Sequence, residues 1–173
     1  LFPVFARKLL GLGPVEVGAA EELVLAETTV AFIPVDIGNP HAVIERLPER
    51  EALLGLGPLV EHHPRFPDRT NVQLVRVDGP HTITVRVWER GAGETLASGT
   101  SACAAAAAMI AAGRCESPVT VRLPGGELAV DLDERGHALL TGPAQEIFRA
   151  ELAPELLAEL GWRKAKGKLV ALP

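Results

Sequence analysis

Residues 98–113 read SGTSACAAAAAMIAAG, and they include no charged side chain. Alanine and methionine favour helix, and a glycine such as Gly113 commonly follows the last helical turn. We therefore predict a helix over 99–112. Because no face of this helix carries a charge that could meet water, the helix should be buried on all sides. At about 1.5 Å per residue it is on the order of 20 Å long, which is too short to cross a membrane.

Strand signals precede this helix. Residues 71–77 and 82–89 alternate apolar and polar side chains on either side of a turn at 78–80, which predicts a β-hairpin. A further strand is expected over 30–37, broken by Pro34 because proline has no N–H to donate to a sheet.

Strand signals also follow the helix. Residues 119–123, 127–132 and 138–141 alternate in the same way, with glycine-containing turns between them. This pattern predicts a β-meander. The expected fold class is α+β, with a mixed, strongly curved, barrel-like sheet wrapped around one central buried helix.

The sequence pattern divides the chain into three parts. Residues 1–29 are rich in leucine with weak periodicity and are poorly assigned, whereas residues 30–148 hold the strands and the helix of the main domain. Residues 149–173 place leucines at helical spacing and are predicted to form a helical tail. The string LLGLGP occurs at 9–14 and at 53–58. Each copy is interpreted as a short helix end closed by glycine and proline.

The composition excludes several classes of function. The net charge is −5 and the 17 Lys and Arg residues are scattered, so no basic face is available to nucleic acid. No apolar run reaches the roughly 18–20 residues that span a bilayer, and we expect a cytoplasmic protein without membrane contact. Cys103 and Cys115 have neither metal-ligand nor disulfide spacing. His62 and His63, which precede a proline, indicate an exposed turn, and no metal site is predicted.

The start of the central helix carries candidate chemistry. The first N–H groups of a helix have no intrahelical acceptor and lie at the positive end of its dipole, with roughly +0.5 charge. A substrate carboxylate would bind there, because Gly99 allows close approach to the backbone and Thr100 adds a hydroxyl. Alternatively, Ser98 or Thr100 only caps the helix, a contact of about 1 kcal/mol. The spacing alone does not separate these two interpretations.

Other polar residues are candidates for the same site. Glu89 lies in phase with the apolar residues of 82–88, so its carboxylate is expected on a buried face, where a charge needs a partner. A solvated pair of Glu89 with Arg90 would instead contribute almost nothing. His41, taken alone, fits an ordinary loop histidine. The chain has only two asparagines, at positions 39 and 71.

Five groups of residues, in their order and spacing, resemble the C-terminal half of the diaminopimelate epimerases. The match covers about residues 30–148, and several motifs in the right order are much stronger evidence than any one of them. The groups are Gly38-Asn39-Pro40-His41-Ala42-Val43, Phe66-Pro67-Asp68-Arg69-Thr70-Asn71-Val72, Arg86 to Ala102, Leu123-Pro124-Gly125-Gly126 and Gly142-Pro143-Ala144.

The resemblance implies two similar domains with an active site between them, and an isomerase that needs no cofactor. In this chemistry one cysteine removes the α-proton of LL-diaminopimelate and a second returns a proton to the opposite face, giving the meso isomer used for lysine and peptidoglycan. By this likeness Gly99 and Thr100 hold the reacting carboxylate, and Glu89 and His41 orient or polarise the acid/base groups. The distal end of the substrate would be held by Asn39, Asn71, Glu89 and Arg90.

Two features depart from the family pattern. The family has cysteine at the position of Ser98, and a hydroxyl is a far weaker acid than a thiol of pKa near 8.5, so epimerisation should fall by at least roughly 10²–10⁴-fold. Cys103 lies about one and a half turns along the helix and is interpreted as a core residue. Residues 1–37 do not resemble the N-terminal half that carries the first cysteine. We therefore expect about half of such an enzyme, inactive alone, whose partners are diaminopimelate and the missing half-domain; a homodimer is compatible with this.

Three functions stay open at this point. The first is diaminopimelate epimerase with Ser98 as a substitution. The second is a relative that acts on another amino acid, either as a racemase or as a one-base dehydratase. The third is a non-catalytic carboxylate-binding domain. The Glu89–Arg90 pair and the two asparagines favour a substrate with a second charged end, and hence the first function.

Overall fold

The computed structural model describes residues 4–9, 14–26, 28–147, 151–165 and 168–171, in two compact units, 1–143 and 144–173. The helices are α1 (Arg50–Glu61), α2 (Gly99–Ala111) and α3 (Pro154–Glu159). The strands are β1 (Val4–Leu9), β2 (Glu16–Val17), β3 (Glu21–Leu25), β4 (Thr28–Asp36), β5 (Pro40–Glu45), β6 (Asn71–Gly79), β7 (Thr82–Glu89), β8 (Gly93–Thr95), β9 (Val119–Leu123), β10 (Gly126–Leu132), β11 (Ala138–Ala144), β12 (Trp162–Ala165) and β13 (Lys168–Ala171).

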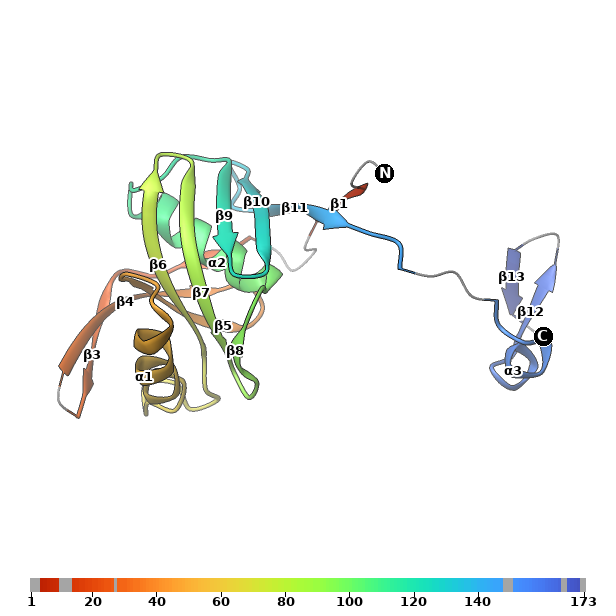
Figure 1. The fold of residues 1–173 in the computed structure, drawn as a ribbon, viewed down its shortest axis with the longest axis horizontal. Coiled ribbons are helices and arrows are strands. Elements are labelled where there is room, and N and C mark those ends of the chain that lie inside the picture. The colour runs from red at the N-terminus through yellow and green to blue at the C-terminus, as the bar shows by residue number, and fades with distance from the viewer. Residues whose placement is uncertain (1–3, 10–13, 27, 148–150, 166–167, 172–173) are drawn as a thin grey trace. The chain divides into compact units, whose positions relative to one another are not determined.

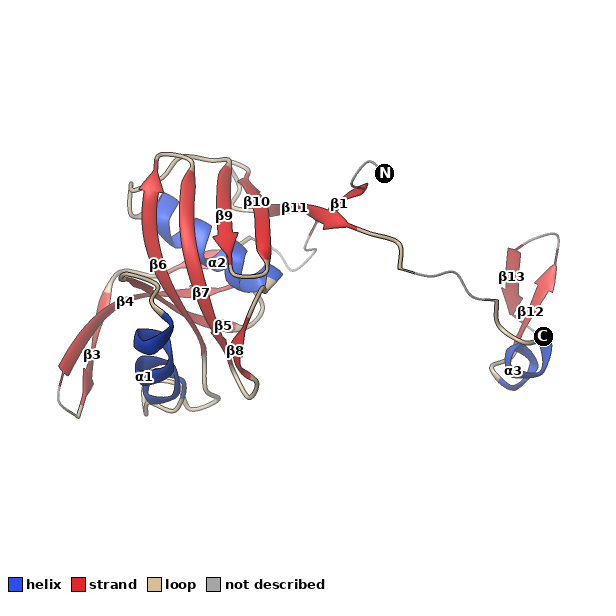
Figure 2. Ribbon diagram, viewed as in Figure 1, coloured by secondary structure: helices blue, strands red, loops and turns tan. Residues whose placement is uncertain are grey.

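Eleven strands of the described residues form one mixed sheet. Its order is β1-β11-β10-β9-β7-β6-β5-β4-β2, with β3 paired to β4 and β8 paired to β7. The pairs β5–β6 and β7–β9 are parallel, whereas β6–β7 and the β9–β10–β11 meander are antiparallel. The sheet curls around α2 (Figure 1), and Figure 2 shows how few helices accompany it. The α+β fold, the hairpin and the meander predicted from the sequence are confirmed.

The central helix is buried on all sides, as predicted. Every side chain from Ser101 to Met109 is buried, and the helix packs against β2, β4, β5, β6, β7, β9 and β10. Small alanine side chains allow these strands to approach closely. Gly113 follows the helix with a φ of +69°, and its N–H donates to the carbonyl of Ile110. This left-handed glycine closes the last turn.

The sheet separates two apolar cores. Because side chains alternate along a strand, β6 places Val75 in the core around α2 and Leu74 in the core beneath α1. The α1 core also contains Phe32 and Phe66, whose rings meet edge to face with centroids 5.6 Å apart. The α2 core continues toward the end of the sheet where the candidate site lies.

Pro34 does not break β4, so that detail of the prediction is wrong. On one side Pro34 pairs with Ala42 of β5. On the other side the pairing of β4 with β3 ends at Phe32, and the pairing with β2 begins at Val35. Proline is tolerated because it lies where the neighbouring strand changes, and no ladder hydrogen bond from its nitrogen is needed there.

The interpretation of 53–58 as a helix end is also wrong, because these residues lie inside α1. The helix buries Leu53 and Val60 in the α1 core, and this burial outweighs the poor helix propensity of its two glycines and of Pro58. Residues 10–13, which make up most of the other copy of the string, lie outside the described residues.

The two ends of the chain differ from the sequence pattern. In the poorly assigned segment 1–29, β2 and β3 pair with β4. In the tail, the helix is shorter than predicted: α3 gives way to the β12–β13 hairpin. Gly161, with a φ of +73°, donates its N–H to the carbonyl of Ala158 and ends the helix. None of α1, α2 and α3 is long and apolar enough to cross a membrane.

Candidate active site

Three strand ends meet at one end of the sheet. β5 and β6 run parallel and begin side by side, with His41 opposite Asn71. β7 runs antiparallel to β6, so it ends at Glu89 beside the start of β6. The register thus brings together three predicted site residues that lie far apart in the sequence. Alternation along each strand directs all three toward the α2 side of the sheet.

A tight turn presents Asn39 at this end of the sheet. Gly38 adopts a φ of +91°, and its N–H donates to Oδ1 of Asp36 over 2.7 Å. A residue with a side chain is disfavoured in this left-handed conformation. Asn39 follows, half-buried, with its Oδ1 3.2 Å from Nε2 of His41.

A buried chain of hydrogen bonds connects His41 to the start of α2. His41 is 1% exposed, and Nε2 of Gln73 lies 2.9 Å from its Nδ1 and 3.1 Å from Oγ of Ser101. Because the Gln73 amide donates to Nδ1, the imidazole proton lies on Nε2, which donates to Asn39. Among the described residues, Oε1 of Gln73 is buried without a partner.

Gln73 and Ser101 were not among the site residues predicted from the sequence. Gln73 lies in phase with Val75 and Val77 on the buried face of β6, so a polar residue at an apolar position was the available signal. Ser101 lies in the first turn of the buried helix. Both side chains are fully buried, and together they join the His41 side of the site to the helix start.

Burial shifts the protonation of His41. It lowers the pKa of the imidazole from 6.5 to about 4, since the charged form would lose its hydration. His41 is therefore a neutral group near neutral pH, able to donate from Nε2 and to accept at Nδ1.

This shift predicts a fall in stability on mild acidification. Between pH 6.5 and about 4 the unfolded state binds a proton that folded His41 does not. The contribution of neutral His41 to the free energy of unfolding is therefore complete above pH 6.5 and is lost as the pH falls. The loss between pH 7 and pH 5 should be about 2 kcal/mol. Urea unfolding at the two pH values measures it.

His41→Gln should flatten this dependence, because the titrating group is gone. His81→Gln removes an exposed imidazole and leaves His41 in place, so the fall should persist. An equal fall in His41→Gln and in the unmodified chain would contradict the assignment.

Asn71 joins two segments of the site. It is buried, its Oδ1 accepts from the backbone N–H of Arg90, and its Nδ2 donates to the carbonyl of Pro40, both over 3.0 Å. The side chain thereby ties the start of β5 to the turn after β7. One amide N–H of Asn71 is left for a further acceptor.

Glu89 and Arg90 differ in their surroundings. Glu89 is half-buried, and within the described part of the chain its carboxylate has neither a hydrogen bond nor an ion pair. Arg90 is exposed, and one guanidinium nitrogen donates to the carbonyl of Asp68 over 2.9 Å. A half-buried carboxylate without a protein partner is a candidate for binding a cationic group.

The start of α2 has no side-chain cap. Ser98 occupies the N-cap position in an extended conformation, with no hydrogen bond from its hydroxyl to the helix backbone, and the first turn has no acidic residue. Gly99 and Thr100 are half-buried. The alternative in which Ser98 or Thr100 caps the helix is therefore not seen, and the first N–H groups are available to an anion.

The glycine-rich turn after β9 supports the segment that precedes α2. The N–H of Gly125 donates to the carbonyl of Leu96 over 2.8 Å, and a Cβ at Gly125 would lie 3.0 Å from that oxygen.

The two cysteines lie elsewhere in the core as free thiols. Burial raises the pKa of Cys103 to about 12, which fits a core residue rather than an acid/base group.

Residues 33–147 match the family model described as diaminopimelate epimerase. The chain belongs to this family. A diaminopimelate epimerase from Pseudomonas entomophila is 50% identical over 120 residues, which are 68% of this chain and 44% of that protein. One from Synechococcus elongatus is 42% identical over 156 residues, 82% of this chain and 54% of that protein. The chain thus spans about half the length of these curated family members.

Solved structures agree on the fold. A predicted epimerase from Pseudomonas aeruginosa superimposes with a TM-score of 0.56 at 22% identity, over 86% of this chain and 58% of that one. A probable proline racemase from Agrobacterium radiobacter has a TM-score of 0.62 at 18% identity, over 87% and 54%. This member of the diaminopimelate epimerase family therefore has the curved-sheet fold of these structures.

Proposed function

We propose that this chain provides the substrate-binding side of a diaminopimelate epimerase, an isomerase that converts LL- into meso-diaminopimelate for lysine and peptidoglycan precursors. The observation that carries the proposal is the family match over 33–147, which includes the three strand ends of β5, β6 and β7 and the start of α2. The curated relatives compared above bear this enzyme's name, which favours this substrate over another amino acid.

In this proposal the start of α2 binds the reacting carboxylate. Removal of the α-proton leaves negative charge on the carboxylate oxygens, and the uncapped N–H groups of Gly99, Thr100 and Ser101 would stabilise it more in the transition state than in the ground state. Such stabilisation supports chemistry without a cofactor.

The second charged end of the substrate would lie at the strand ends. The carboxylate of Glu89, which has no partner among the described residues, suits the distal ammonium group, and Arg90 suits the distal carboxylate. The free donors of Asn39 and Asn71 would complete the contacts. His41, neutral and buried, would orient or polarise an acid/base group from its position beside Asn39.

Ser98 stands at the acid/base position in this assignment. Its hydroxyl should exchange protons poorly near neutral pH, so the protein is expected to bind diaminopimelate better than it turns it over. The other acid/base group would come from the half of the family enzyme that this chain does not span. A cytoplasmic location is part of the same proposal, since the proposed substrate is a small molecule of biosynthesis.

The test is an isomerisation assay with the longest natural protein that contains this chain. LL-diaminopimelate is incubated with the protein and with Ser98→Cys, and the meso isomer is measured by chiral chromatography. We expect slow conversion by the first and faster conversion by the second. Racemisation of another amino acid, with no conversion of diaminopimelate by either protein, would reject the proposal.

A further inference from the structure

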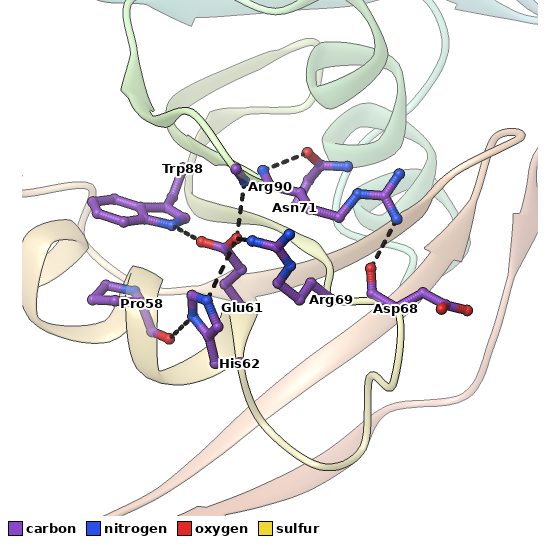
Figure 3. A network of polar contacts seen from close by, with 9 residues as sticks. Pro58, Glu61, His62, Asp68, Arg69, Asn71, Trp88 and Arg90 are labelled. Atoms are coloured by element: carbon purple, nitrogen blue, oxygen red, sulfur yellow. Dashed lines mark hydrogen bonds and ion pairs between the residues drawn. The ribbon is translucent and has the colours of Figure 1, made fainter.

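Glu61, the last residue of α1, is a buried carboxylate with several partners (Figure 3). Its side chain is 4% exposed. Oε2 accepts from the indole Nε1 of Trp88 over 2.7 Å, and Oε1 accepts from the backbone N–H of Gly91 over 2.9 Å. Arg69 lies 3.3 Å from Oε1. Charge-assisted hydrogen bonds of this kind are about twice as strong as neutral ones.

These partners lie on both sides of the candidate binding pair. Trp88 immediately precedes Glu89, and Gly91 immediately follows Arg90. One carboxylate therefore holds the chain before and after the two residues proposed to contact the distal end of the substrate. Burial alone would raise the pKa of Glu61, but the hydrogen bonds from Trp88 and Gly91, together with the nearby His62 and Arg69, keep the pKa below its usual range.

The contact with Trp88 supports the direction in which Glu89 points. Neighbouring residues of a strand project from opposite faces of the sheet. Trp88 lies on the α1 side, where it packs beside the α1 core, so Glu89 is held toward the α2 side. Without the hydrogen bond to Glu61, only the backbone pairing of Trp88 with Val72 and Glu94 would hold the end of β7 in this orientation.

The contact with Arg69 stabilises the loop that leads from α1 into β6. Arg69 adopts a φ of +61°, a conformation that is uncommon for a residue with a side chain and that tertiary contacts must stabilise. It directly precedes Thr70 and Asn71, and Asn71 accepts from the N–H of Arg90. Glu61 thus helps to position Arg90 in two ways: through its hydrogen bond with Gly91, and through its contact with Arg69 in the segment that leads to Asn71.

We infer that Glu61 is a positioning residue for recognition of the distal end of an amino-acid substrate. It sets the place of Glu89 and Arg90 without touching the substrate. The inference rests on the proposed function for the identity of that substrate. Its consequence is that Glu61 governs affinity for a second charged end more than it governs proton transfer.

The decisive variant is Glu61→Gln, which keeps the shape of the side chain. Its amide oxygen can still accept from Trp88, but its amide nitrogen cannot accept from Gly91. Glu94→Gln is the matched control: Glu94 lies on the neighbouring strand β8, where its backbone pairs with Trp88, but its carboxylate pairs with Arg50 and Arg86 and not with Glu61.

Two measurements are made on the longest natural protein that contains the chain. Amide hydrogen exchange reports whether Arg90 and Gly91 remain protected. Kinetics with diaminopimelate, and with a competing amino acid that has one charged end, give KM and kcat separately. For Glu61→Gln we expect faster exchange at both amides and a rise of about tenfold in KM for diaminopimelate, because the N–H of Gly91 has lost its charged acceptor.

We expect kcat to fall less than KM rises, and affinity for the one-ended competitor to stay within about twofold, since its contacts lie at α2. Glu94→Gln should change none of these values by more than about twofold. Unchanged exchange in Glu61→Gln, or equal loss of affinity for both ligands, overturns the inference. If the unmodified protein does not bind diaminopimelate, the proposed function fails, and the exchange result alone then supports or overturns the positioning by Glu61.

Discussion

Ser98→Cys is expected to accelerate α-proton exchange of diaminopimelate by roughly 10²–10⁴-fold, the usual contribution of a general acid/base group. Ser98 is half-buried at the N-cap of α2, and its hydroxyl makes no capping contact, so a thiol can replace it without loss of a hydrogen bond to the helix. A thiol has a pKa near 8.5, and the positive end of the α2 dipole should lower it further. A cysteine at this position would therefore exchange protons near neutral pH.

The measurement is incorporation of deuterium at the α-carbon in deuterated water, followed by mass spectrometry. The longest natural protein that contains the chain is compared with its Ser98→Cys and Ser98→Ala variants. Ser98→Ala should match the unmodified protein within about twofold, because the serine hydroxyl contributes little. If Ser98→Cys exchanges no faster than Ser98→Ala, position 98 is not an acid/base position.

Gly57→Ala is expected to destabilise the chain by about 1–3 kcal/mol, the usual cost of overpacking. A Cβ at Gly57 would lie 2.6 Å from Cγ and Cδ2 of Trp88, which no real contact permits. The indole is rigid and its Nε1 is held by Glu61, so it cannot yield without breaking that bond. The change should therefore disturb the end of β7 as well as α1.

Gly55→Ala is the matched control in the same helix. Gly55 is exposed, and a Cβ there would meet nothing within 4 Å. Because alanine loses less conformational entropy than glycine in a helix, this variant should gain roughly 0.5–1 kcal/mol. Urea unfolding of both variants gives the comparison, and a Gly57→Ala chain as stable as Gly55→Ala would show that Trp88 moves freely.

Much of the fold could be predicted from local sequence patterns. The uncharged run 99–112 requires a buried helix wherever it lies, and period-two alternation defined the bounds of β7 and the order of the meander. Alternation also predicted the face of Glu89, since the phase of a strand is a local property. The extent of α1 was missed because its glycines and Pro58 weaken the local helix signal, and its stability comes from packing against the sheet.

The tertiary structure decided which polar residues act together. The family resemblance implied one site for Asn39, His41 and Asn71, and the parallel register of β5 and β6 is what brings His41 and Asn71 side by side. Glu61 has no local signature that distinguishes it from other polar residues, and the phase of Gln73 in β6 does not show which residue it meets. Gln73 contacts His41 from a distance of 32 positions in the sequence, and Glu61 contacts Trp88 from a distance of 27 positions. Sequence periodicity reports which face a residue occupies, whereas long-range strand pairing determines what it meets there.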